Sequence, residues 1–129
     1  MNKIINNLVL GEEYISQITF DAIKEELRVN IRHIMRSGPN NCEWGFDEEL
    51  AIDEGVLVFT GVEKIFFDPN GTLPNDIDDI KVEELSEAFK VTFHCYGFES
   101  KVSVPADFSV VAKEVYLIDT KNPDIKITE

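Results

Sequence analysis

The chain has 129 residues, of which 43% are hydrophobic and 29% are charged, and its formal net charge is −13 at pH 7. This length suits one domain, residues 1–129, and the apolar content is sufficient for a core and too high for a disordered chain. The negative charge argues against binding to nucleic acid or to an anionic membrane surface, because both need cationic protein surface. No apolar run approaches the roughly 20 residues of a membrane helix, and the N-terminal residues lack the apolar region and cleavage site of a signal peptide, so we expect a cytoplasmic protein.

The first predicted element is a short strand over residues 13–21, and the segment after it allows two interpretations. As a strand, residues 26–36 alternate, with Leu27, Val29, Ile31, His33 and Met35 on one face and Arg28, Asn30, Arg32, Ile34 and Arg36 on the other. As a helix, residues 22–37 would begin after Asp21 and end at Gly38-Pro39. The β-branched residues of this segment favour the strand, whereas a helix there would make the fold α+β.

A polar insertion follows at residues 38–55, with one helical turn expected near Asp47–Leu50. The clearest strand comes next, at residues 56–68, and its apolar parity changes near Gly61, which predicts a bulge or bend. Residues 68–71, Asp-Pro-Asn-Gly, are a turn by composition.

The second half of the chain consists of short alternating segments separated by turns. Residues 77–85 and 88–97 predict a hairpin around Glu87, residues 100–104 and 110–118 predict two further strands, and residues 125–128 are a candidate edge strand. The sequence therefore predicts an all-β domain, an antiparallel β-sandwich or meander of about seven or eight short strands.

The cysteines and histidines do not form a recognisable catalytic or zinc-binding set. Cys95 is expected in the core and Cys42 in the polar insertion, both unpaired, as suits a reducing compartment. We expect His33 on the apolar face of its strand and His94 on the outer face of its strand, opposite to Cys95, which argues against a Cys–His nucleophilic pair. The sequence contains no phosphate-binding glycine loop and no nucleophile elbow, so we expect no enzymatic activity, no cofactor and no metal.

Nearly all the excess negative charge lies in one segment. Residues 43–87 contain 14 acidic and two basic residues, which is a net charge of −12 out of −13. We interpret this segment as a surface for a basic partner, with Trp44 as an apolar anchor rimmed by carboxylates. The predicted partner-binding residues are Trp44, Asp47, Glu48, Glu49, Asp53, Glu54, Asp76, Asp78, Asp79, Glu83 and Glu84.

The loop from Asp68 to Asp79 matches an EF-hand calcium loop poorly, because Gly71 falls at position 4 instead of 6 and an aspartate stands at position 12. A calcium loop of another type, using Asp68, Asp76 and Asp78, stays open. The alternative hypothesis is therefore a β-sandwich module that binds a small ligand, calcium or a carbohydrate, through this loop and Trp44.

Three segments, GEEYISQITFD, DEGVLVFTGVEKIFFDPNG and LPNDIDDIKVEEL, resemble small acidic bacterial proteins of uncharacterised families. In size, acidity and all-β character the chain is also similar to immunity proteins of bacterial polymorphic or contact-dependent toxin systems. This resemblance implies a protein that is not an enzyme and that binds and neutralises a cognate toxin domain, often a basic nuclease. The leading hypothesis is an immunity protein whose acidic surface covers a basic toxin.

Overall fold

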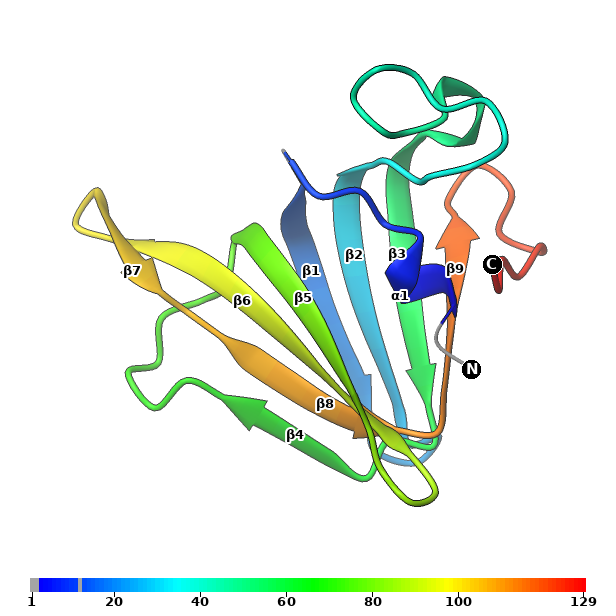
Figure 1. Cartoon of the computed structure of the whole chain (residues 1–129). Coiled ribbons are helices and arrows are strands. Elements are labelled where there is room, and N and C mark those ends of the chain that lie inside the picture. Colours follow the sequence, from blue (N-terminus) through cyan, green and yellow to red (C-terminus); the bar gives the residue numbers. More distant parts are fainter. Residues whose placement is uncertain (1–2, 12) are drawn as a thin grey trace.

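The protein is one nine-stranded, open antiparallel β-sheet with very little helix (Figure 1). The computed structural model describes residues 3–11 and 13–129. Its helical elements are α1 (Lys3–Asn6) and one 3-10 turn (Glu48–Leu50), and no helix in the described part of the chain has the length and apolar character to cross a membrane. The strands are β1 (Tyr14–Asp21), β2 (Glu26–Ile34), β3 (Ile52–Thr60), β4 (Lys64–Phe67), β5 (Asp76–Glu84), β6 (Phe89–Glu99), β7 (Val102–Pro105), β8 (Phe108–Ala112) and β9 (Glu114–Asp119). The all-β prediction is confirmed, and the segment that allowed two interpretations is a strand.

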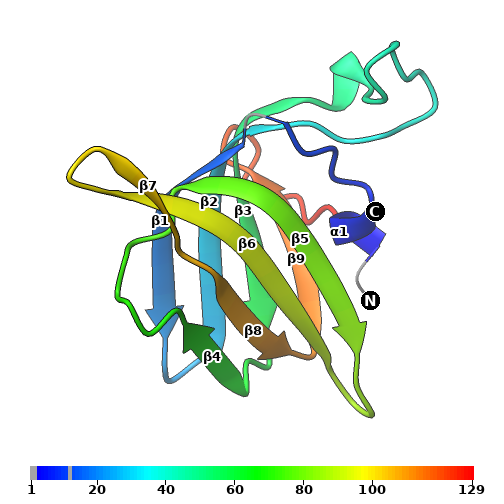
Figure 2. The same ribbon diagram turned by 60° about the vertical axis from the view of Figure 1, so that its left-hand side comes forward.

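The sheet folds on itself at the boundary between β1 and β5. Its strand order is β4-β8-β6-β5-β1-β2-β3-β9, with β7 paired to β6. β1 and β5 share one residue pair, Tyr14 with Asp76, and beyond it the half with β1, β2, β3 and β9 faces the half with β5, β6, β8 and β4 (Figures 1 and 2). An aromatic contact joins the halves: Phe59 of β3 meets Phe93 of β6 edge to face at 6.1 Å between ring centroids. Within the second half, Phe93 stacks on Phe108 of β8 at 4.5 Å.

The predicted alternation of β2 holds up to His33 and then fails. His33 is exposed and adopts a positive φ of 62°. This conformation breaks the alternation, so that Ile34 enters the core and Arg36 is only 8% exposed. The expectation that His33 lies on the apolar face is therefore wrong, and Arg36 does not share the outer face with Arg28 and Arg32.

Gly61 divides the predicted strand of residues 56–68 into two. β3 ends at Thr60 and β4 begins at Lys64, and Gly61 between them has a φ of 61°, which glycine adopts without a steric penalty. β4 does not continue beside β3 but pairs with β8 in the other half of the sheet. The predicted bend is confirmed, and it carries the chain from one half to the other.

The remaining predicted turns and strands are present with small changes of boundary. The hairpin of β5 and β6 turns between Leu85 and Ala88, and residues 68–71 form a turn closed by a hydrogen bond between the ends. The predicted strand of residues 110–118 is interrupted at Lys113, which separates β8 from β9. The candidate edge strand at the C-terminus contributes one bridge, between Leu117 and Ile127.

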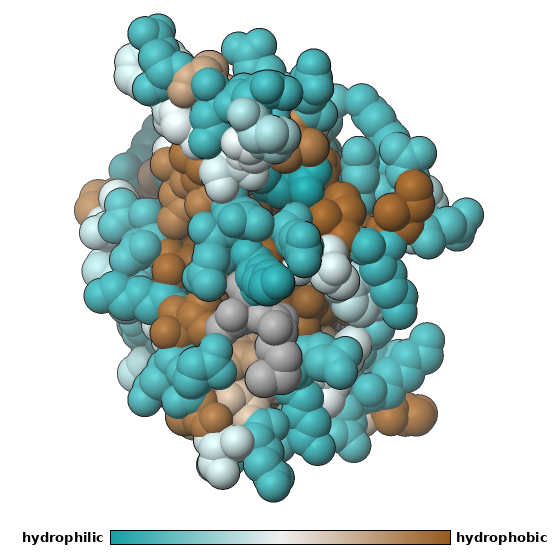
Figure 3. All heavy atoms as spheres, turned by 45° about the vertical axis from the view of Figure 1, so that its right-hand side comes forward, coloured by the Kyte–Doolittle hydropathy of each residue, from teal (hydrophilic) through white to brown (hydrophobic). Residues whose placement is uncertain are grey.

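The N-terminal segment closes one open side of the folded sheet (Figure 2). We call residues 3–10 the N-terminal plug. Ile4 and Ile5 of α1 are 0% and 5% exposed and belong to the core. The plug is tied to the end of β2, because the Val9 N–H donates to the Met35 carbonyl at 2.8 Å. The surface on this side is mostly hydrophilic, with hydrophobic residues visible between polar side chains (Figure 3).

Candidate functional site

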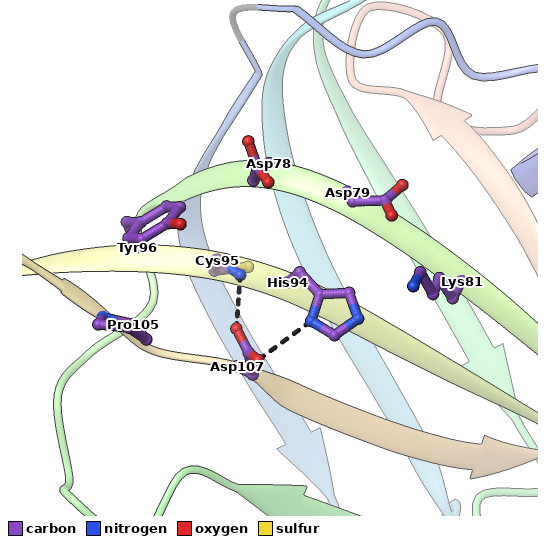
Figure 4. A pocket seen from close by; sticks show the side chains of 8 residues that line it. All are labelled: Asp78, Asp79, Lys81, His94, Cys95, Tyr96, Pro105 and Asp107. Atoms are coloured by element: carbon purple, nitrogen blue, oxygen red, sulfur yellow. Dashed lines mark hydrogen bonds and ion pairs between the residues drawn. The ribbon is translucent and has the colours of Figure 1, made fainter.

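A recess of about 390 Å³ lies on the outer face of the sheet, over β5 and β6 (Figure 4). Three of its side chains are carboxylates and one is a lysine. We call it the acidic recess, and it is lined by Asp78, Asp79, Lys81, His94, Cys95, Tyr96, Pro105 and Asp107.

Strand pairing explains why these side chains meet. β6 alternates between the core and the outer face, and His94 and Tyr96 lie on its outer face. On β5 the register shifts between Ile77 and Asp79, so that Asp78 is an extra residue and Asp79 stands opposite His94. Two consecutive carboxylates therefore line the recess, which a regular strand would place on opposite faces.

Asp107, in the turn between β7 and β8, is held by two hydrogen bonds (Figure 4). Its Oδ1 accepts the backbone N–H of Cys95 at 3.0 Å, and its Oδ2 lies 3.0 Å from Nδ1 of His94. Because a carboxylate only accepts hydrogen bonds, Nδ1 of His94 carries the proton of this pair. The Asp107 carboxylate is thus positioned by its own chain, which reduces the ordering cost of binding a cation.

Cys95 contributes its backbone to the recess and not a reactive thiol. Its side chain is 1% exposed and belongs to the core. Burial, together with the negative charges of Asp107 and Asp76, raises the pKa of the Cys95 thiol to about 12, so the thiol stays protonated at neutral pH. The predicted core position of Cys95 is confirmed, and both cysteines are unpaired.

The side chains of the acidic recess are of the kinds that can bind an organic cation. Asp78, Asp79 and Asp107 supply acceptors for an ammonium or guanidinium group, and charge-assisted hydrogen bonds of this kind are the strong ones. Tyr96 is 40% exposed and offers an aromatic face for a cation–π contact. The positive charge of Lys81 offsets one of the three negative charges of the carboxylates.

The predicted acids on β5 divide between the recess and the far end of the strand. Asp78 and Asp79 line the recess, and Asp76 lies beside it, opposite Tyr96. Glu83 and Glu84 lie two and three residues beyond Lys81, at the end of β5, and neither lines the recess.

The predicted acids before and within β3 have mainly local partners. Asp47 is only 2% exposed and accepts the backbone N–H groups of Asn40 and Glu49. It therefore fixes the loop before β3 and does not lie on the predicted partner surface, a correction that its burial requires. Asp53 pairs with Lys121 at 2.8 Å, and Glu54 lies 3.8 Å from Arg32. Glu48 and Glu49 remain exposed on the 3-10 turn.

Trp44 is 75% exposed on a turn with a defined shape. The Cys42 N–H donates to the Phe46 carbonyl at 2.8 Å, and the Gly45 N–H donates to the Cys42 carbonyl at 3.0 Å. The loop projects beyond the ends of β2 and β3, whereas the recess lies over β5 and β6 (Figure 1). Trp44 is thus a separate feature and not an apolar centre of the acidic recess.

A single row of paired residues connects the acids near β3 with the acids of β5. Glu54, Arg32, Tyr14 and Asp76 are successive partners across β3, β2, β1 and β5. Because the cationic Arg32 stands between the acids, the two groups do not merge into one continuous acidic face.

The loop between β4 and β5 uses its polar side chains for its own turn. Oδ1 of Asp68 accepts the Asn70 N–H, and Oδ1 of Asn70 accepts the Thr72 N–H. Within residues 3–11 and 13–129, no group of three or more His, Cys, Asp or Glu side chains is arranged to hold a metal ion.

Lys81, His94, Tyr96 and Asp107 are not among the site residues predicted from the sequence. The alternation of β6 does place His94 and Tyr96 on the outer face, beside the acids of β5 once the hairpin is drawn. Asp107 follows Pro105 in a turn, and only the tertiary pairing of β6 with β8 brings it to His94.

The sequence matches a protein-family model over residues 1–129, and the model is described as a family of unknown function, DUF6258. The chain belongs to this family. Neither the search of curated proteins nor the search of solved structures found a match.

Proposed function

We propose that this member of the DUF6258 family is a non-enzymatic binding protein whose acidic recess holds a lysine or arginine side chain of a basic protein partner. The observation that carries the proposal is that Asp78, Asp79 and Asp107 line one recess together with the exposed Tyr96. A guanidinium or ammonium group satisfies these acceptors without a bound metal.

The charge distribution supports the same kind of partner. Residues 43–87 carry −12 of the net charge of −13, and a concentrated negative field accelerates the association of a positively charged protein. The recess provides the specific contact, and the surrounding acids provide the attraction at longer range.

The partner that fits best is a basic toxin domain, for example a nuclease, which makes the chain an immunity protein. Support comes from the similarity in size, acidity and all-β character to such proteins. A second contact in this proposal is Trp44, because an exposed tryptophan on a hydrogen-bonded turn is a typical interface anchor.

The test compares two variants that remove the same charge from the same region. Asp78→Asn with Asp79→Asn changes the recess, whereas Glu83→Gln with Glu87→Gln changes exposed acids near the far end of β5. Immobilised wild type and both variants are incubated with an extract of the source organism. The captured proteins are purified, and their rates of association with each form are measured by surface binding at two salt concentrations.

We expect one basic protein to bind the wild type and the control alike. The recess variant should bind it about tenfold more slowly at low salt, with a smaller difference at high salt. Equal association rates of the captured protein with all three forms, or capture of no basic protein by the wild type, would contradict the proposal. The immunity role requires in addition that the captured protein is toxic when expressed alone and harmless when co-expressed with the wild type.

A further inference from the structure

The folded sheet has a second open side. Unlike the side closed by the N-terminal plug, this side is lined by apolar residues that remain exposed. It contains a cavity of about 450 Å³ bounded by β1, β2, β4 and the loop between β4 and β5. We call it the apolar cavity. Its lining includes Phe20 of β1, Ile65 and Phe67 of β4, Asp68, and residues 71–74 of the following loop.

The wall formed by residues 71–74 is fixed by contacts of residues 72–75 with β6. Gly97 of β6 has no side chain, and a Cβ there would collide with the carbonyl group of Leu73. The Thr72 hydroxyl donates to the Glu99 carboxylate, and the Asn75 N–H donates to the Tyr96 carbonyl at 3.0 Å. The cavity is therefore formed without a ligand, as is usual for small-molecule sites.

Large apolar side chains remain in water around this cavity. Phe20 and Phe67 are each 55% exposed, and Leu73 is 82% exposed. Such clustering of exposed apolar residues around a concave surface is a property of binding sites.

Among the described residues that line the cavity, Asp68 is the one that is ionisable. Its Oδ1 accepts the Asn70 N–H, and its Oδ2 has no hydrogen bond to any described residue of the chain. Its carboxylate, in a protein of net charge −13, repels anionic ligands and attracts a cation.

We propose that the apolar cavity binds a small hydrophobic amine. The apolar body of the ligand contacts Phe20, Ile65 and Phe67, and its ammonium group pairs with Asp68. The volume lies within the range of small-molecule pockets, about 300–1,000 Å³. This site is distinct from the acidic recess and does not depend on the partner proposed above.

Three probes of equal chain length test the proposal by titration calorimetry: octylamine and octanoate, each below its micelle concentration, and octanol below its solubility limit. We expect octylamine to bind most tightly, octanol roughly fivefold more weakly for want of the ion pair, and octanoate most weakly. Asp68→Asn should abolish the preference for the amine and leave the affinity for octanol unchanged. No binding of any probe, or equal affinity for octanoate and octylamine, would overturn the proposal.

Two phenylalanines of similar exposure provide a matched control. Phe20→Ser removes a ring from the cavity, whereas Phe98→Ser removes a ring that is 59% exposed near the turn between β6 and β7. All three probes should lose affinity with Phe20→Ser and keep it with Phe98→Ser. Sedimentation velocity distinguishes a second copy as the occupant: a concentration-dependent dimer that Phe20→Ser abolishes and Phe98→Ser retains would replace the ligand with a protein interface.

Discussion

The folded sheet leaves two open sides, and the chain covers only one of them. On the side of the N-terminal plug, Ile4 and Ile5 are almost completely buried and polar side chains dominate the surface (Figure 3). On the side of the apolar cavity, Phe20, Phe67 and Leu73 remain largely exposed. Both sides adjoin the same core, so the difference lies in whether a segment of the chain covers the opening.

Apolar residues therefore have two different roles in this protein, one in stability and one in binding. Apolar surface stabilises the fold by about 25 cal/mol for each Å² that leaves water. Residues of the plug contribute in this way, whereas the exposed residues around the cavity contribute only when another molecule covers them. The following predictions test this distinction, from the largest expected effect to the smallest.

The first prediction compares one buried residue of the plug with one exposed residue of the cavity. Ile4→Ala should lower the free energy of unfolding by about 2–5 kcal/mol, because it empties a buried volume in the core. Leu73→Ala, at a side chain that is 82% exposed, should change it by less than about 0.5 kcal/mol. Urea denaturation measures both. Equal losses would show that the loop around the cavity is part of the core and that the two sides do not differ.

The second prediction concerns the loop before β3, which adjoins the plugged side through Arg36. The Asp47 N–H donates to the Arg36 carbonyl, and Arg36 forms an isolated bridge with Leu8 of the plug. Asp47→Ala leaves two backbone N–H groups without their acceptor and should cost about 1–3 kcal/mol. Glu48→Ala, one residue further along and exposed, is the control and should be nearly neutral. Increased mobility of Trp44 in fluorescence anisotropy should accompany the loss in Asp47→Ala alone.

The third prediction uses Cys95 to ask whether the core beneath the acidic recess is dry. Burial and nearby carboxylates raise the pKa of the Cys95 thiol from its ordinary value of 9.0 to about 12. A raised pKa gives stability that is complete below pH 9 and is lost as the pH rises toward 12, because the unfolded chain releases this proton first. At pH 10 the loss is about 1 kcal/mol.

Cys95→Ala provides the measurement, since it removes this titration. The difference in unfolding free energy between the wild type and the variant should shrink by that amount between pH 8 and pH 10. A constant difference would mean that water reaches the thiol, and the acidic recess would then extend into the core.

The arrangement of strands could be predicted from local pattern because most strands alternate regularly. The alternation of β6, from Phe89 to Cys95, predicts its buried face correctly. The failures come from single residues that break the period. His33, with its positive φ, sends Ile34 and Arg36 inward. Histidine adopts this conformation more often than most residues, but it does so rarely, so its presence in a strand pattern does not predict the break.

The acidic recess could be predicted only in part because it combines residues distant in sequence. Asp78 and Asp79 are conspicuous in an acidic segment, but the bulge that places both at the recess depends on the pairing of β5 with β6. Asp107 reaches His94 from a turn more than ten residues away. Charge density thus indicated a region, whereas pairing between strands determined which acids meet.

The smallest effect is expected for the ion pair that joins the two termini. Lys3 at the start of the plug lies 3.5 Å from Glu129, and the two side chains are 70% and 74% exposed. An exposed pair of this kind contributes about 0–1 kcal/mol, so Lys3→Met should lower the free energy of unfolding by less than about 0.5 kcal/mol. Raising the salt concentration should likewise leave the plug in place, because salt screens the ion pair but not the buried side chains of Ile4 and Ile5. Hydrogen exchange at the Val9 amide, which donates to Met35, reports opening of the plug directly. If Lys3→Met or high salt accelerated this exchange as much as Ile4→Ala does, the plug would be held by charge, and the contrast between the closed and the open side would not rest on apolar burial.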